Sequence, residues 1–217
     1  MKFLYDARAG GENLEIVNEA FLHLKARRVR AGERISARNL KDGKDYLYEI
    51  TDLSRKSANL NLVFTSPAPA EDYALTLGWA VVEPKTIEKT LPFLNELGVG
   101  KLAFVYTKFS QANFKLDSAR FEYLCALSCE QCGRGRLMEF EIYKNLDDFL
   151  NAYPNAAAVN FGGENLAGFK GETLIIGPEG GFTPEEIRKF RKIYALGAKN
   201  ILKSQTAITG VASKILL

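Results

Sequence analysis

The segment 176–187 has the residues best suited to surround a ligand. It reads Ile-Gly-Pro-Glu-Gly-Gly-Phe-Thr-Pro-Glu-Glu-Ile and begins at the end of an apolar run. Gly177, Gly180 and Gly181 allow the backbone to come close to a bound molecule. The segment has no Gly-Lys-Ser/Thr triplet, and its glutamates would repel a phosphate group. The loop therefore favours a neutral or cationic ligand, with a plain strand-to-helix connection as the alternative.

The second half of this segment has the signature of a helix start. Thr183 has the residue type of an N-cap, Pro184 suits the first helical position, and Glu186 completes a capping box. Apolar residues recur at helical spacing as far as Leu196, and Gly197 follows as a stop signal. We therefore predict a helix over 184–195.

A second group of reactive residues is formed by Cys125, Cys129 and Cys132. Their C-x3-C-x2-C spacing is that of radical enzymes that hold an iron–sulfur cluster. The run around them has helical periodicity, however, whereas the ligands of such a cluster normally lie on a loop. We therefore predict that the cysteines pack in a helix and that the chain has no metal site, with the cluster enzyme as an alternative.

The positive charge is concentrated near the N-terminus. The chain has 29 Lys+Arg and 26 Asp+Glu, yet residues 67–217 carry as many acids as bases. Between residues 21 and 44 there are eight basic residues and two acidic ones. Such a cluster is typical of a nucleic-acid surface, because each phosphate contact releases counterions; a solvated basic face is the alternative. The basic residues are Lys25, Arg27, Arg28, Arg30, Arg34, Arg38, Lys41 and Lys44.

The N-terminal part has the pattern of a small β domain. Apolar residues alternate with period two around 35–37, 46–50 and 60–64, which predicts a meander of antiparallel strands. A helix is expected before them, over 15–26. The segment 65–72, Thr-Ser-Pro-Ala-Pro-Ala-Glu-Asp, has the composition of a linker.

The remainder alternates between short apolar strands and helices. This order predicts a parallel sheet that is covered on both faces, and ligands of such sheets bind beyond the carboxyl ends of the strands. The glycine-rich segment described first follows one of these strands. The expected strands are 78–83, 102–107, 139–143, 156–161 and 173–177, and the expected helices are 85–97, 117–131, 145–151, 184–195 and 206–216.

Composition excludes several classes of protein. The 217 residues are 47% apolar and 25% charged, which fits an ordinary globular protein and argues against disorder. No apolar run approaches the roughly 18–20 residues of a membrane helix, and the N-terminus has no secretory pattern. His23 is the single histidine, which excludes two-histidine zinc motifs. We expect no membrane partner and a cytoplasmic location with reduced thiols.

Several segments together resemble the ribosomal RNA small subunit methyltransferase E family, which belongs to the SPOUT superfamily. They are IGPEGGFTPEEI (176–187), LGAKNILKSQTAI (196–208), SCEQCGR (128–134), LNELGV (94–99) and HLKARRVRAGERI (23–35). The resemblance covers nearly the whole chain. It implies an α/β fold with a PUA-like RNA-binding β-barrel at 1–66 and, at 72–217, a parallel-sheet methyltransferase domain with a C-terminal trefoil knot. It also implies a homodimer.

The function that the resemblance implies is transfer of a methyl group from S-adenosylmethionine to N3 of a uridine in 16S ribosomal RNA, within the small ribosomal subunit. Three loops, 160–163, 176–181 and 196–207, would hold the cofactor. The implied cofactor-binding residues are Phe161, Gly162, Ile176, Gly177, Gly180, Gly181, Leu196, Ile201, Leu202, Thr206 and Ala207. The implied RNA-binding residues are Arg27, Arg28, Arg30 and Arg34.

Methylation of uridine N3 requires removal of its proton. Glu130 and Glu179 are the candidate bases, and Arg134 and Lys203 are candidates for stabilising negative charge on the base; a structural ion pair or cap is the alternative for all four. Lys203 stands where the family pattern has Arg, which removes a bidentate fork. Gln205, two residues later, likewise stands where that pattern has Glu. These departures leave a second hypothesis, a ribosome-assembly RNA-binding protein with an inactive methyltransferase domain.

Overall fold

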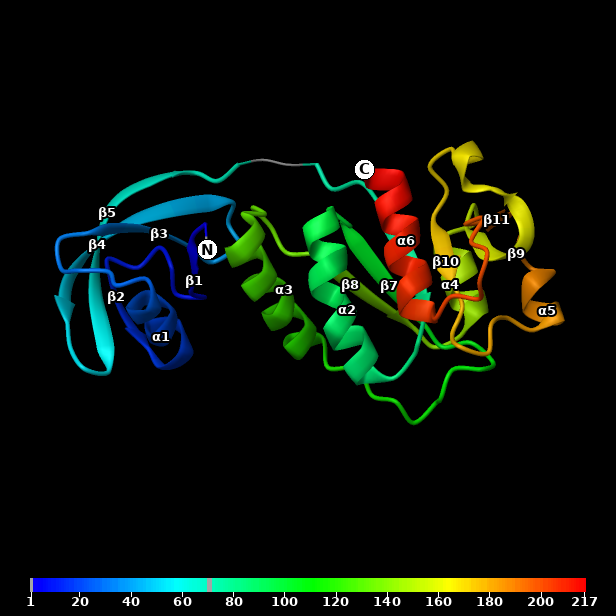
Figure 1. Ribbon diagram of the computed structural model, residues 1–217, viewed down its shortest axis with the longest axis horizontal. Coiled ribbons are helices and arrows are strands. Elements are labelled where there is room, and N and C mark those ends of the chain that lie inside the picture. The colour runs from blue at the N-terminus through cyan, green and yellow to red at the C-terminus, as the bar shows by residue number, and fades with distance from the viewer. Residues whose placement is uncertain (1, 70–71) are drawn as a thin grey trace. The chain divides into compact units, whose positions relative to one another are not determined.

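The structure, a computed structural model, describes residues 2–69 and 72–217 (Figure 1). The chain forms two units. Unit 1 combines the described part of Met1–Glu71 with Ala126–Leu137, and unit 2 contains the rest.

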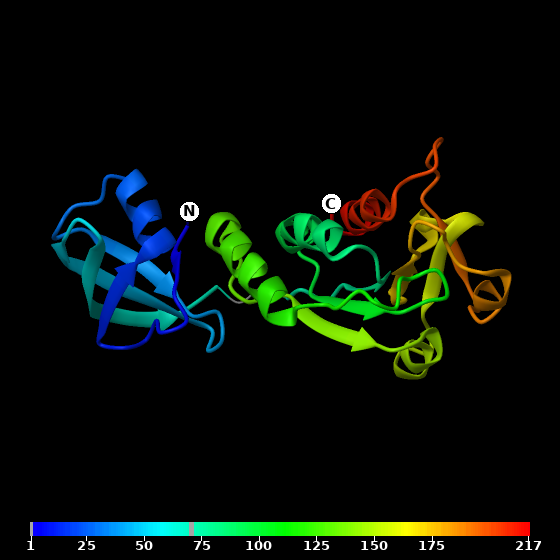
Figure 2. The same cartoon turned by 90° about the horizontal axis from the view of Figure 1, so that it is seen from below.

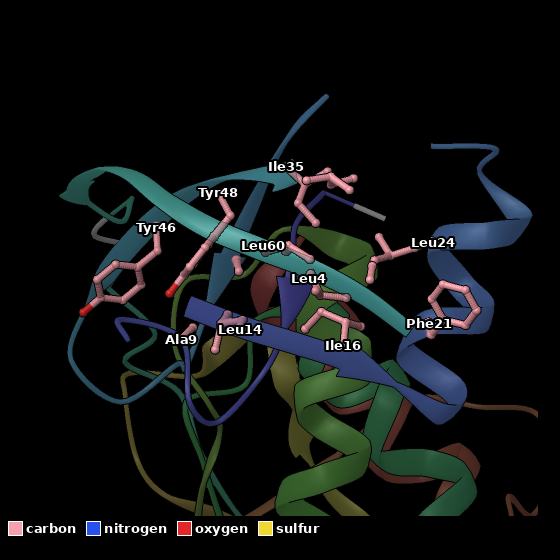
Figure 3. Packing of buried hydrophobic residues seen from close by; sticks show 13 residues of the cluster. Leu4, Ala9, Leu14, Ile16, Phe21, Leu24, Ile35, Tyr46, Tyr48 and Leu60 are labelled. Carbon is pink, nitrogen blue, oxygen red and sulfur yellow. The ribbon is translucent and has the colours of Figure 1, made fainter. Parts of the chain in front are cut away.

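Unit 1 is built on a five-stranded sheet with strand order β1-β3-β4-β5-β2. β3, β4 and β5 are antiparallel neighbours, as the alternating pattern predicts. Tyr48, Leu60 and Ile16 point into its core, and Leu24 of α1 packs against them (Figure 3). The elements are β1 (Leu4–Tyr5), β2 (Asn13–Val17), α1 (Asn18–Ala26), β3 (Arg34–Arg38), β4 (Lys44–Leu53) and β5 (Ser57–Pro67).

Two sequence predictions in unit 1 are corrected. The helix expected over 15–26 starts only at Asn18, because Leu14 and Ile16 alternate into the core and β2 pairs with β5. The linker expected over 65–72 overlaps β5, which runs to Pro67, and its residues 70–71 lie outside the described residues.

The segment Ala126–Leu137 packs in unit 1, although its position in the sequence placed it in the second domain. Ala126 and Cys129 lie in one buried cluster with Phe3 and Leu40. The Lys2 backbone N–H donates to the Glu130 carbonyl at 2.7 Å. The segment contains the last turns of α3 (Ser118–Cys132), so the division between the units falls inside one helix.

Unit 2 is built on a six-stranded sheet in which every pair of neighbours is parallel, as predicted. The strand order is β11-β9-β10-β6-β7-β8. The chain first moves outward from β6 to β8, then crosses to β9, and β10 enters between β9 and β6. The elements are β6 (Thr76–Ala80), α2 (Pro84–Leu97), β7 (Lys101–Val105), α3, β8 (Glu139–Tyr143), α4 (Leu146–Ala152), β9 (Ala157–Asn165), η1 (Leu166–Gly168), β10 (Leu174–Ile176), α5 (Pro184–Ile187), β11 (Ile193–Ala195) and α6 (Ser204–Leu216).

Helices cover both faces of this sheet. α2 and α6 lie side by side on one face, and α4 lies on the other (Figure 2). Trp79 of β6 and Phe104 of β7 are fully buried beneath the helices, and Phe104 contacts Phe121 of α3 with ring centroids 5.4 Å apart. The C-terminal trefoil knot stays a prediction.

The helix expected over 184–195 is wrong in its length. α5 ends at Ile187 after four residues, and Ile193–Ala195 forms β11, which pairs with β9. Tyr194 accounts for this difference, because its ring is fully buried and its hydroxyl donates to the Glu172 carboxylate at 2.9 Å. These tertiary contacts outweigh the helical spacing of the local sequence.

The described residues contain no helix that is both long enough and apolar enough to span a membrane.

Candidate active site

A cavity of about 550 Å³ is lined by the segments that follow β10 and β11 and by residues 159–162. This volume is in the range of small-molecule sites. The position also follows the general rule for parallel sheets, since the strand order changes direction beside β10. The loop expected at 160–163 is corrected, because these residues lie within β9, which continues to Asn165 and pairs with β11. The lining residues are Val159, Asn160, Phe161, Gly162, Ile176, Gly177, Pro178, Glu179, Gly180, Gly181, Phe182, Ala195, Leu196, Gly197, Ala198, Asn200, Ile201, Leu202, Ser204 and Ala207.

The structure brings together the residues that were expected to hold a cofactor. Of this set, only Thr206 does not line the cavity, and its side chain is exposed on α6. Phe161 and Ile201 are large apolar residues of the lining that remain 72% and 84% exposed. Glu179 is the only charged side chain among the described lining residues. The cavity is thus mainly apolar, with one carboxylate.

The loop 177–181 after β10 needs glycine. Gly181 has a φ of 71°, a left-handed conformation that side chains disfavour. Its N–H donates to the Pro178 carbonyl at 2.9 Å, which closes a turn. A Cβ on Gly180 would lie 3.2 Å from the Cβ of Phe109, so this position has little room for a side chain.

The predicted capping box after this loop is confirmed. The Glu186 backbone N–H donates to Thr183 Oγ1 at 3.2 Å, and the Thr183 N–H donates to Glu186 Oε2 at 2.9 Å. The other carboxylate oxygen of Glu186 accepts from the Lys108 N–H at 2.8 Å, a contact that the sequence analysis missed. Glu186 is buried, so one carboxylate joins two loops at the carboxyl edge of the sheet.

A buried hydrogen-bond chain holds α6 against the glycine loop. Trp79 Nε1 donates to Ser204 Oγ at 2.8 Å, and Ser204 Oγ donates to the Gly177 carbonyl at 2.5 Å. Trp79 and Ser204 were not among the predicted site residues. No local motif could identify them, because they are separated by 125 positions in the sequence.

The four candidate catalytic residues are divided between the two units. Glu179 is exposed on the cavity wall, and Lys203 is exposed at the N-cap of α6 without lining the cavity. Glu130 and Arg134 belong to unit 1, where each is buried. Burial raises the pKa of the Glu130 carboxyl, with a backbone hydrogen bond from Tyr5 acting in the opposite direction.

Two side-chain oxygens, one on a candidate catalytic residue and one on Gln205, have no hydrogen-bond partner among the described residues. They are Glu130 Oε1 and Gln205 Oε1, and both atoms are buried. The Nε of Arg134 donates to the Arg136 carbonyl at 2.8 Å, which anchors the segment that follows α3.

The three cysteines lie on α3. Cys125 and Cys129 are buried, which confirms helix packing for these two, whereas Cys132 is exposed. The described residues contain no group of three or more His, Cys, Asp or Glu side chains placed to hold a metal ion.

The basic segment lies on the surface of unit 1 with the exception of Arg38. The prediction is corrected for this residue, because its side chain is buried and its Nε lies 2.9 Å from the Asp45 carboxylate. Arg27, Arg28 and Arg30 are exposed after the end of α1. Arg34 on β3 is exposed as well, and its Nε lies 3.3 Å from the Glu49 carboxylate, so that its charge is partly balanced.

Comparisons with known proteins cover both units. The model of an RNA methyltransferase domain matches residues 69–216, and that of an RNA methyltransferase PUA domain matches residues 16–63. The chain is 44% identical to ribosomal RNA small subunit methyltransferase E of Helicobacter pylori strain J99, with 98% of both chains covered. It is 23% identical to the protein of that name from Rickettsia conorii, over 96% of this chain and 92% of the relative.

Solved structures show the same fold. Ribosomal RNA small subunit methyltransferase E from Neisseria gonorrhoeae, solved with S-adenosyl methionine, matches with a TM-score of 0.79 at 21% identity, covering 99% of this chain and 96% of the other. A methyltransferase from Legionella pneumophila, solved with bound SAM, matches with a TM-score of 0.79 at 24% identity over the same shares. At these identities the likeness shows the fold alone, a PUA-like unit followed by a parallel α/β sheet. Together with the match to the RNA methyltransferase model and the near full-length relative from Helicobacter pylori, it follows that the chain belongs to the ribosomal RNA small subunit methyltransferase E family.

Proposed function

We propose that this protein methylates ribosomal RNA of the small subunit with S-adenosylmethionine as methyl donor, and that the acceptor is N3 of a uridine. The observation that carries the proposal is the cavity lined by β9 and by the segments that follow β10 and β11, in a chain whose relatives are named as methyltransferases of this RNA.

The cavity residues suit this cofactor. Phe161, Leu196, Ile201 and Leu202 offer apolar contacts for adenine and for the methionine chain. Gly180 and Gly181 of the glycine loop have no side chains of their own, so the backbone can come close to a ligand. S-adenosylmethionine supplies an electrophilic methyl group on a sulfonium cation, and the single carboxylate of the lining, Glu179, does not oppose a positive charge.

Glu179 is the proposed base. Its carboxylate is exposed on the cavity wall, whereas the other candidate, Glu130, is buried in unit 1. It would take the N3 proton, while Lys203, exposed at the N-cap of α6, would stabilise the negative charge that develops on the uracil oxygens. The reaction then requires the chain to hold the uracil ring beside the cavity in a near-attack geometry.

The basic residues Arg27, Arg28, Arg30 and Arg34 are proposed as the phosphate-binding surface of unit 1. We further propose a cytoplasmic homodimer that acts on the small ribosomal subunit, as the family resemblance implies. Sedimentation of the purified protein tests the dimer.

The function is tested by binding and by product analysis. Isothermal titration should show binding of S-adenosylmethionine and of its demethylated product. Unmethylated 16S rRNA, free and assembled in small subunits, should gain one methyl group, which mass mapping should place on uridine N3. Cofactor binding with a methyl group at another position would refute the N3 assignment. RNA binding without cofactor binding would instead support the assembly protein with an inactive domain.

A further inference from the structure

The loop 106–117 between β7 and α3 is a feature that the sequence analysis did not use. It follows a strand of the parallel sheet, so it begins at the edge where the cavity lies. Its residues 107–116 read Thr-Lys-Phe-Ser-Gln-Ala-Asn-Phe-Lys-Leu, with two lysines, two phenylalanines, two amides and no acid. Cations, aromatic rings and amides are the groups with which proteins bind single-stranded RNA.

This loop is fixed to the glycine loop at two points. The Lys108 N–H donates to Glu186 Oε1 at 2.8 Å, and Glu186 also caps α5. Phe109 lies against Gly180, since a Cβ built on that glycine would stand 3.2 Å from the Cβ and Cγ of Phe109. In Figure 1 the loop is the bright green connection that runs toward the orange segment before α5.

Hydrogen bonds within the loop hold its shape. The Ser110 N–H donates to the Thr107 carbonyl at 3.0 Å, and the Phe114 N–H donates to the Gln111 carbonyl at 3.1 Å. The hydroxyl of Tyr106 donates to the Phe114 carbonyl at 2.5 Å. A loop ordered in this way can present a side chain at small entropic cost.

Phe109 is the side chain that this arrangement presents. Phe109 is 52% exposed even though its Cβ lies against Gly180, and Gly180 itself lines the cavity. Gly180 therefore lies between the exposed ring of Phe109 and the cavity. Lys108 and Lys115 are exposed on the same loop.

We propose that the loop 106–117 binds the RNA segment that carries the acceptor base, with a nucleobase stacked on Phe109 and phosphates contacted by Lys108 and Lys115. This inference rests on the proposed function and adds a second RNA surface, on unit 2. Glu186 is a positioning residue in this arrangement, because its carboxylate holds the loop to the wall of the cavity.

The test compares Phe109→Ala and Phe109→Trp with Phe93→Ala, in the full-length chain. Phe93 is a matched control, since it is 56% exposed in unit 2 but lies on α2. Methylation of unmethylated 16S rRNA is followed at several RNA concentrations, and the affinity for S-adenosylmethionine is measured by titration.

We expect Phe109→Ala to raise the KM for RNA about 10- to 100-fold, in line with loss of one stacked base. The Kd for the cofactor should stay within about twofold of the wild-type value, because Phe109 does not line the cavity. Phe109→Trp should restore the KM, and Phe93→Ala should behave as wild type. Lys108→Gln combined with Lys115→Gln should raise the KM and weaken its dependence on salt.

An unchanged KM in Phe109→Ala, or a loss of cofactor binding in that variant, would overturn the inference. Failure of the proposed function is distinguishable, because the wild-type protein would then not bind the cofactor. Fluorescence anisotropy with labelled rRNA would in that case still show weaker binding by Phe109→Ala if the loop contacts RNA.

Discussion

At the scale of single residues, charge is used sparingly around the cavity. Glu179 is the only charged side chain among the described lining residues, and Lys203 stands just outside the lining. An exposed carboxylate on the wall of an apolar cavity can reach a proton of a bound substrate, which a general base requires.

Glu179→Gln removes this carboxylate while keeping its shape. We expect kcat to fall about 100- to 10,000-fold, with little change in the Kd for S-adenosylmethionine. Glu185→Gln is the control, because Glu185 is an exposed glutamate nearby in sequence that pairs with Arg188 at 3.2 Å. Unchanged turnover would direct attention to Glu130→Gln.

Glu172, which precedes β10, is joined to β11 and to the residue before it by hydrogen bonds from Tyr194 and Lys192. Burial opposes its ionisation, yet the Lys170 N–H and the side chains of Lys192 and Tyr194 together lower the pKa of its carboxyl to about 2. A carboxyl whose pKa is lower in the folded than in the unfolded protein stabilises the fold above its ordinary pKa. This contribution is lost as the pH falls from the ordinary value, 4.5, toward 2.

Glu172→Gln should therefore lower the free energy of unfolding by about 1 kcal/mol near neutral pH. Its stability should also depend less on pH than that of the wild type in the acidic range. Urea unfolding at a series of pH values measures both effects. Glu164→Gln serves as the control, because Glu164 is exposed and lies 3.9 Å from the same lysine. Parallel acid profiles for wild type and Glu172→Gln would contradict the assignment.

At the scale of elements, the cavity depends on how strand ends are tied to helix starts. The glycine loop is held on one side by the capping box of α5 and on the other by Ser204, at the start of α6. A change in either tie should alter the shape of the loop, and Ser204 also lines the cavity itself.

Ser204→Ala tests the second tie. Trp79 Nε1 and the Gly177 carbonyl would both lose a buried partner, so we expect a loss of about 2 kcal/mol in unfolding free energy. The affinity for S-adenosylmethionine should fall severalfold as the loop loosens. Thr209→Ala, on the same helix, removes only a bond to the Gln205 carbonyl and should change affinity little. A destabilised variant with unchanged affinity would limit Ser204 to a structural role.

The elements that the sequence predicted well are those whose signals are local. α2 begins at Pro84 and ends at Gly98, which has a φ of 97°, and its buried residues recur at helical spacing. The capping box of α5 is likewise a short-range pattern, and the glycine loop follows the apolar strand β10 as expected.

Other features depend on partners distant in the sequence. β11 is stabilised by the hydrogen bond from Tyr194 to Glu172. The loop 106–117 is held in position by the hydrogen bond from the Lys108 N–H to Glu186, which is 78 positions away in the sequence. The alternation of Leu14 and Ile16 was a visible strand signal that the prediction of a helix overlooked. The glycine loop could be identified from its residue types. Trp79 and Ser204 could not, because their roles come from a tertiary contact.

At the scale of the whole molecule, the net charge of +3 is distributed unevenly along the chain. The excess lies within residues 21–44 of unit 1, while residues 67–217 are balanced. Recognition of RNA by phosphate charge and chemistry at the cavity can therefore be disturbed independently.

The variant Arg27→Gln/Arg28→Gln/Arg30→Gln should weaken binding to 16S rRNA and flatten its dependence on salt, because fewer counterions are released. The titration with S-adenosylmethionine should be unaffected. Arg55→Gln/Lys56→Gln removes two exposed cations elsewhere in unit 1 and is the control. Equal salt slopes for the triple variant and the wild type would show that these arginines do not contact phosphates. Filter binding over a range of salt concentrations provides the slopes.

The packing of Ala126–Leu137 in unit 1 has a consequence for biosynthesis. An N-terminal domain usually folds while the rest of the chain is still being translated. Here the buried cluster that contains Phe3 and Leu40 also contains Ala126 and Cys129, so unit 1 cannot be completed until residue 137 has left the ribosome. β6 and β7 must be translated first, so the folding of unit 1 is completed only after part of unit 2 has been synthesised.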